Sequence, residues 1–134
     1  MSTGRRWLGV VALAAGGAGW LVRRRLILVS VHGTSMSPTL RPGDRRLAWR
    51  PGRARPARVR GGDVVVFVPP GSGPGEPPFI KRVTALPGDP VPGRRAVTVP
   101  AGHLWVVGDG SPSADSRDFG PVALRSVVAR VLRC

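Results

Sequence analysis

The sequence is poor in the residues from which metal sites and disulfides are built. Its 134 residues include one cysteine, Cys134, two histidines, His32 and His103, and no tyrosine. A single cysteine excludes an intrachain disulfide, and no Cys/His cluster has the spacing of a metal site. We therefore expect neither a metal nor another cofactor.

Acidic residues and lysine are also scarce. The chain has seven Asp and Glu residues and 21 Lys and Arg residues, which give a formal net charge of +14. Lys81 is the only lysine. Arginine does not deprotonate in a protein, whereas a desolvated lysine can do so near neutral pH. Lys81 follows the apolar stretch 77–80, which makes it a candidate general base. The alternative is that a lone lysine is chance in an arginine-rich chain.

Eight of the arginines lie between Arg41 and Arg60, where the only acid is Asp44. Surfaces that bind nucleic acid interleave aromatic with basic residues, but Trp49 is the only aromatic residue here, so we expect no nucleic-acid partner. Two interpretations of this stretch stay open. It either faces anionic lipid or is a solvated loop.

Residues 7–22 carry no charge and lie between Arg5-Arg6 and three arginines at 23–25. Sixteen residues fall short of the roughly 20 that span a bilayer. Snorkelling arginines and the terminal tryptophans Trp7 and Trp20 can make up the difference. We predict an uncleaved membrane anchor within residues 1–25, rather than an interfacial helix or a signal peptide. The arginine balance alone leans slightly towards a cytoplasmic C-terminal part.

The rest of the chain, residues 26–134, has the pattern of a β domain. The 34 glycines and prolines are typical of short strands joined by turns. The stretch 63–68 is apolar on both faces, which predicts a fully buried strand, and 108–120 is a long polar loop. We expect the other strands at 26–31, 44–49, 79–86, 96–99 and 103–107, and a last strand or short helix at 127–132.

A possible catalytic site emerges from three separated segments. Ser35 lies in a turn after an apolar strand, but a serine is a weak nucleophile unless a base activates it. Lys81 on a later strand is the candidate base, and the polar loop 108–117 contributes further side chains. His32 stands three residues from Ser35 and raises a Ser/His/Asp triad as an alternative, although it lies on the same strand end.

The chain resembles the type I signal peptidases, membrane-bound serine proteases with a Ser/Lys dyad. Four blocks carry the resemblance, in the family's order. They are Gly-x-Ser-Met-x-Pro-Thr (33–39), Gly-Asp-Val-Val-Val-Phe (62–67), Lys-Arg-Val-x-x-Leu-Pro-Gly-Asp (81–89) and Ser-Ala-Asp-Ser-Arg (113–117).

The resemblance implies roles for individual residues. Ser35 matches the nucleophile, Lys81 the general base, and Ser113 a serine that hydrogen-bonds and orients the lysine. The backbone N–H of Ser35 matches an oxyanion donor. The expected supporting residues are Met36 beside the site, Asp109 in the polar loop, and the ion pair of Asp115 and Arg117.

Two departures from the family pattern affect the expected site. Family members usually have Gly-Asp-Asn where this chain has Gly-Asp-Gly at 108–110, and the loop that follows is one residue shorter. Some members place a serine hydroxyl, a second oxyanion donor, where this chain has Gly33. Thr34 or the backbone would then serve, and one such donor is worth roughly 3 kcal/mol.

The resemblance implies a mostly β fold of two antiparallel sheets preceded by one N-terminal transmembrane helix. It also implies cleavage of exported preproteins after small residues, with the catalytic domain on the extracytoplasmic face of a cell membrane. The expected partners are therefore preproteins and lipid. Two alternatives stay open: a maturation peptidase with one client, as for nickel superoxide dismutase, and a self-cleaving DNA-binding regulator of the LexA type. The apolar, glycine-rich residues 1–25 cannot supply the helix-turn-helix that the regulator needs.

Overall fold

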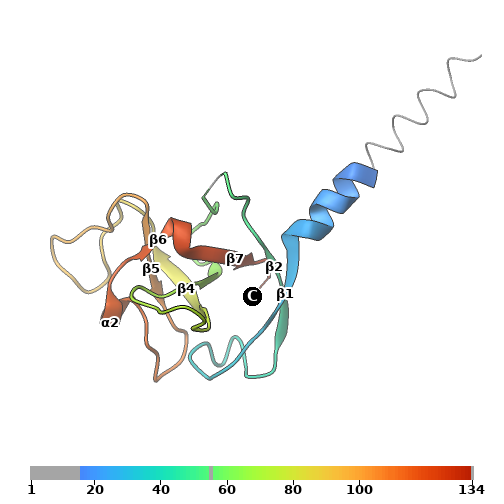
Figure 1. The fold of residues 1–134 in the computed structure, drawn as a ribbon. Helices are drawn as coiled ribbons and strands as arrows, with labels where there is room; N and C mark the ends of the chain where they lie inside the picture. Colours follow the sequence, from blue (N-terminus) through green and yellow to red (C-terminus); the bar gives the residue numbers. More distant parts are fainter. Residues whose placement is uncertain (1–15, 55, 134) are drawn as a thin grey trace, which may run out of the picture.

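Seven short strands and the turns between them make up most of the chain, which a computed structural model describes for residues 16–54 and 56–133 (Figure 1). The strands are β1 (Leu26–Ser30), β2 (Arg45–Trp49), β3 (Val64–Phe67), β4 (Phe79–Ala85), β5 (His103–Val107), β6 (Val122–Ala123) and β7 (Val127–Val131). One helical turn, α2 (Ser116–Phe119), precedes β6, and a 3₁₀ turn, Leu124–Ser126, follows it. The mostly β character predicted from the sequence is confirmed.

The strands form one sheet in the order β1-β2-β7-β3-β4-β5-β6, and every pair is antiparallel. The expectation of two separate sheets is therefore wrong. The register shifts between Val66 and Phe67 in the β3–β7 pair and between Val83 and Ala85 in the β4–β5 pair. Such irregularities increase the local twist, so a single sheet can curl and enclose a core.

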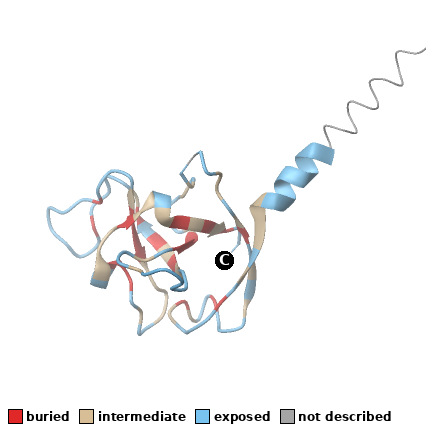
Figure 2. Ribbon diagram, viewed as in Figure 1, coloured by how far each residue is buried: buried red, intermediate tan, exposed pale blue. Residues whose placement is uncertain are grey.

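The central strand β3 has both faces buried, as its apolar sequence predicts (Figure 2). Val64 and Val66 pack in one core cluster with residues of β2, β7 and the turn after β1. Val65 and Phe67 pack in a second cluster with residues of β4, β5, β6 and β7. Because the two clusters lie on opposite faces of β3, the curled sheet holds together segments that are far apart in the sequence.

Two local predictions differ from the structure. The expected strand at 96–99 is not formed: only Thr98 pairs, in an isolated bridge with Pro90, and Ala96 has a positive φ of 59°. The expected loop 108–120 contains α2, whose N-cap Asp115 accepts a hydrogen bond from the Arg117 N–H while Asp118 accepts one from the Asp115 N–H. This reciprocal capping stabilises a helical turn that is too short for a periodicity signal.

Residues 16–25 are helical and lead directly into β1, and this helix points away from the sheet (Figure 1). In the described part of the chain no helix is both long and apolar enough to cross a membrane. The predicted anchor at 7–22 lies mostly in residues 1–15, outside the described residues. The predicted boundary between an anchor and a β domain at residue 25 stays a prediction.

Candidate active site

Ser35 lies in a tight turn between β1 and β2 that starts at Gly33. Gly33 has a φ of 76°, a left-handed conformation that glycine adopts without steric cost. The turn closes through hydrogen bonds from the Ser37 N–H to the Thr34 carbonyl (2.9 Å) and from the Leu40 N–H to the Met36 carbonyl (2.9 Å). Met36 is buried in the core cluster, as expected for a residue packed beside the site, and it anchors the turn so that half-buried Ser35 faces a cleft.

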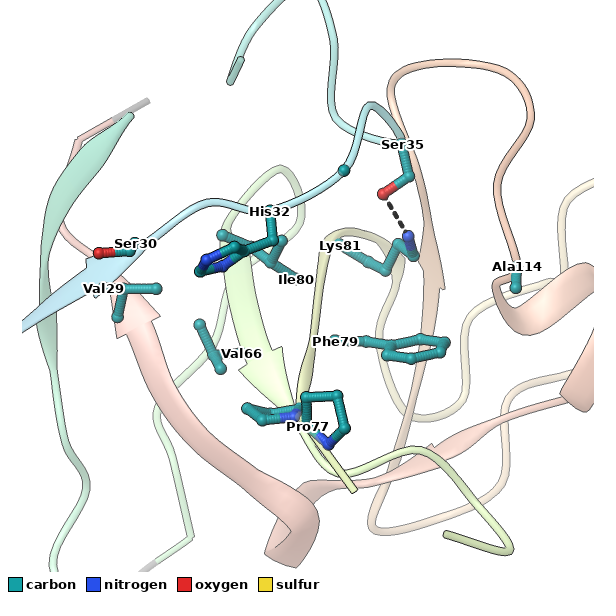
Figure 3. A pocket seen from close by; sticks show the side chains of 12 residues that line it. Val29, Ser30, His32, Ser35, Val66, Pro77, Phe79, Ile80, Lys81 and Ala114 are labelled. Carbon is teal, nitrogen blue, oxygen red and sulfur yellow. Dashed lines mark hydrogen bonds between the residues drawn. The ribbon is translucent and has the colours of Figure 1, made fainter. Parts of the chain in front are cut away.

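Lys81 reaches the same point from β4. Its backbone pairs with Val65 of β3, and its side chain is only 4% exposed. Lys81 Nζ lies 2.5 Å from Ser35 Oγ, within hydrogen-bond distance (Figure 3). Two residues 46 positions apart are thus brought together, as the sequence predicted for this pair.

The surroundings of Lys81 favour the neutral amine. Burial lowers the pKa of Lys81 from its ordinary value, and the negative charge of Asp115 opposes this effect only in part. An uncharged amine has a lone pair that can accept the Ser35 hydroxyl proton, which an ammonium cannot do. His32 lines the same cleft, but its side chain points away from the serine (Figure 3). The geometry therefore favours Lys81 over His32 as the base for Ser35.

The loop after β5 packs directly on the nucleophile turn. The Gly110 N–H donates a hydrogen bond to the Ser35 carbonyl (2.8 Å). A Cβ at position 110 would lie 2.7 Å from the carbonyl oxygens of Thr34 and Ser37, and one at Gly108 would lie 2.5 Å from the Ser35 carbonyl and collide with Ser113. Both glycines are needed for this close approach, a role that the sequence analysis did not assign to them.

Arg82 and Asp109 fasten this loop to β4. Arg82 donates through Nε and Nη2 to the two Asp109 carboxylate oxygens (2.8 and 2.7 Å), and its Nη1 donates to the Gly62 carbonyl (2.7 Å). The hydrogen bonds from Arg82 hold the pKa of Asp109 below its ordinary value. The sequence analysis expected Asp109 to support the site but did not identify Arg82, whose position beside Lys81 places it on the opposite face of β4.

Asp115 is fully buried and organises the second half of the loop. It accepts hydrogen bonds from the Arg117 side chain (2.9 and 2.7 Å), from the Gly108 N–H (3.0 Å) and from the Ser113 hydroxyl (2.9 Å). Burial alone would raise the pKa of Asp115, but these hydrogen bonds hold it well below its ordinary value. The ion pair of Asp115 and Arg117 is present as expected.

Ser113 has a different partner from the one expected. Its hydroxyl donates to Asp115, whereas it was expected to hydrogen-bond Lys81. The loop is one residue shorter than the family pattern, and Asp115, two residues further on, supplies a stronger, charged acceptor. Lys81 is instead influenced by the charge of Asp115 itself.

The backbone N–H of Ser35 accounts for one possible oxyanion donor. Among residues 16–54 and 56–133 it has no hydrogen-bond acceptor, whereas the neighbouring Ser37 N–H is used within the turn. A backbone donor left unpaired beside a nucleophile can stabilise a developing negative charge. Gly33 has no side chain that could donate a hydrogen bond. Within the described residues, the Thr34 hydroxyl makes no hydrogen bond.

The cleft around Ser35 and Lys81 has a volume of about 810 Å³. Its walls are mostly apolar and come from β1, β3, β4 and the segment before β4 (Figure 3). They include Val29, Val66, Phe79, Ile80 and Pro77, with Ala114 on the opposite side. An extended, largely apolar peptide segment fits such a cleft better than a charged ligand does.

Comparison with protein families gives one matching family, described as "Signal peptidase, peptidase S26". The match covers residues 4–97 and 92–134. These two ranges contain all the residues of the candidate active site.

Several named proteins are similar to the chain. Mitochondrial inner membrane protease subunit 2 of Mus musculus is 42% identical over 106 residues, which cover 70% of this chain and 58% of the mouse protein. Subunit 2 of Saccharomyces cerevisiae is 35% identical over 118 residues (78% and 65%), and subunit 1 of Schizosaccharomyces pombe is 36% identical over 107 residues (75% and 67%). The match thus spans about three fifths of the length of the first two relatives.

Proposed function

The chain belongs to the signal peptidase family, peptidase S26, and we propose that it is a serine endopeptidase that removes N-terminal signal peptides from preproteins. The observation that carries this proposal is the 2.5 Å approach of the buried Lys81 amine to the Ser35 hydroxyl. Family membership supports a protease, and the geometry of this pair supports a Ser/Lys dyad as its mechanism.

In the proposed mechanism the neutral Lys81 amine accepts the Ser35 hydroxyl proton while Oγ attacks the scissile carbonyl carbon. The Ser35 N–H stabilises the resulting oxyanion. The Lys81 ammonium then gives its proton to the leaving amine as the peptide bond breaks, which leaves an ester on Ser35. Water, deprotonated by Lys81, hydrolyses the ester, releases the carboxylic acid and restores the serine.

The relatives named above are mitochondrial inner membrane proteases, so all three are membrane enzymes by name. For this chain we propose attachment through residues 7–22, with residues 26–134 forming the catalytic domain on the extracytoplasmic face of a cell membrane. The apolar cleft supports a substrate whose membrane-bound signal segment ends beside Ser35. The resemblance to signal peptidases implies small residues at the first and third positions before the cut.

Cleavage of a model preprotein tests the proposed function. The full chain, reconstituted in vesicles, is expected to cut a preprotein with alanine at the first and third positions before the cut, at that single site. A matched preprotein with leucine at both positions is expected to be cut at least about tenfold more slowly, since a pocket for a small residue rejects added methylenes. N-terminal sequencing of the product locates the cut. Equal cleavage of both substrates, or cleavage of neither, would contradict the proposal.

Gly110 provides a test of the loop that supports Ser35. We expect Gly110→Ala to lower kcat/KM by about 10²-fold, because the added Cβ would push the loop off the Thr34 and Ser37 carbonyls and displace the nucleophile by a fraction of an ångström. The matched control is Gly61→Ala, where a Cβ meets nothing within 4 Å. Similar rates for both variants, measured on the same preprotein, would show that the close contact at Gly110 does not position Ser35.

A further inference from the structure

A second pocket lies at the opposite end of β1, where helix 16–25 meets the sheet. It has a volume of about 770 Å³, and four arginines and two tryptophans dominate its lining: Trp20, Arg24, Arg25, Trp49, Arg50 and Arg53. No residue of the peptidase mechanism takes part in it. We call it the helix–sheet pocket.

The helix–sheet pocket is tied together by the pairing of β1 with β2. Leu26 pairs with Trp49, and the Arg50 N–H donates a hydrogen bond to the Arg25 carbonyl (2.7 Å). The Arg25 guanidinium lies over Gly52, where a Cβ would come within 3.0 Å of Nη2. Gly52 therefore leaves room for a cation at the pocket wall, and the arginines are held near one another by the fold.

The charge of the pocket is uncompensated by acidic residues. None of the residues that line it is acidic, and in residues 16–54 and 56–133 its four arginines form no salt bridge. Asp44 is the only acid between residues 1 and 62, and it pairs with Arg46. Several guanidinium groups gathered without a counter-charge repel one another, so an anion that binds among them is strongly favoured.

An apolar surface continues from this pocket along the outer face of the sheet. Leu28 and Leu47 pair across β1 and β2, and the Leu132 N–H donates to the Leu47 carbonyl, so the three leucines are neighbours. All three are exposed, by 59%, 54% and 42%. On the helix side of the pocket, Trp20 is 54% exposed, and the Arg24 guanidinium stacks over its ring, 3.7 Å from the ring centre.

We propose that the helix–sheet pocket binds the phosphate of an anionic phospholipid headgroup, with the neighbouring leucines and Trp20 in contact with the lipid interface. Arginine and tryptophan are the residues expected at headgroup depth, and arginine binds phosphate through two parallel hydrogen bonds. A nucleic acid would satisfy the arginines, but it offers no apolar partner to the leucines beside them. The combination therefore favours lipid over a soluble polyanion.

This binding has a consequence for the active site. The helix–sheet pocket lies at the start of β1, whereas Val29 and Ser30 at its end line the catalytic cleft. Five strand residues span about 16 Å. A bound headgroup would thus keep the cleft within about one strand length of the membrane surface.

Native mass spectrometry of the full chain in neutral detergent micelles tests the proposal. The micelles contain equal amounts of phosphatidylglycerol and phosphatidylcholine, and bound lipids are counted. We expect one phosphatidylglycerol adduct to exceed the phosphatidylcholine adduct by about tenfold, and Arg50→Gln/Arg53→Gln to remove this preference. Arg41→Gln/Arg95→Gln, which removes the same charge from exposed positions outside the pocket, is expected to keep it.

Three results would overturn the proposal. An equal loss in both double variants would show that only the overall charge attracts the lipid. Complete displacement of the lipid by an excess of glycerol 3-phosphate would show a site for a soluble phosphate, and displacement by a DNA oligonucleotide would show a nucleic-acid site. Because the readout is bound lipid, it is independent of whether the chain cleaves preproteins.

Discussion

Replacing Ser35 by alanine is expected to abolish preprotein cleavage, with kcat falling by more than about 10⁴-fold. The hydroxyl that forms the acyl-enzyme in the proposed mechanism is lost, and in the described part of the chain Lys81 Nζ has no second hydrogen-bond partner that could replace it. Stability is expected to change little, since Ser35 is only half-buried and, among the described residues, its Oγ makes no hydrogen bond that holds the turn.

The matched control for this prediction is Ser72→Ala. Ser72 lies in the loop before β4, outside the cleft lining. The two variants are compared in the reconstituted preprotein assay, at equal amounts of folded protein. Cleavage by Ser35→Ala at more than about one hundredth of the unmodified rate would show that Ser35 is not the nucleophile.

Lys81→Arg is expected to be inactive to a similar degree, because a guanidinium stays protonated and cannot accept the Ser35 proton. The substitution keeps the positive charge, so it separates the need for a base from the need for a cation. The reverse exchange on an exposed loop, Arg95→Lys, is the control and is expected to leave the rate unchanged.

A guanidinium is larger than an ammonium, and Lys81 is 96% shielded, so Lys81→Arg can also disturb the fold. Lys81→Met answers this concern, because methionine keeps the length and apolar stem of lysine without its amine. We expect Lys81→Met to unfold at the same temperature as the unmodified chain or higher, and to be inactive. A folded Lys81→Met protein that cleaves the preprotein would rule out Lys81 as the base.

The two residues of the proposed dyad were predictable because each carries its own chemical signal. Ser35 stands in a turn with glycine and proline at fixed places, and Lys81 is the only lysine in an arginine-rich chain. The buried strand β3 was predictable for a similar reason, since its residues are apolar on both faces. What the sequence could not show is how the sheet curls, because one sheet and two sheets produce the same alternation of apolar residues.

The contacts within loop 108–117 were not predictable from local pattern. Ser113 donates to Asp115 because the loop brings these two side chains together, and their spacing alone did not distinguish this partner from Lys81. The packing of Gly108 and Gly110 on the nucleophile turn is likewise a contact between distant segments. This contact could have been predicted from the change of the family's asparagine to Gly110, because the change removes a side chain where the loop backbone packs on the backbone of the nucleophile turn.

The most direct test of the proposed base is an NMR titration of the Lys81 side chain. Because the chain has one lysine, labelling with ¹³C-lysine gives a single set of side-chain signals that needs no assignment. Burial lowers the pKa of Lys81, so the titration midpoint is expected below the ordinary lysine value of about 10.4. Preprotein cleavage, which needs the neutral amine, is then expected to be lost as the pH falls through that same midpoint. A midpoint at or above the ordinary value, in a folded and active chain, would contradict a mechanism in which Lys81 takes the proton of Ser35.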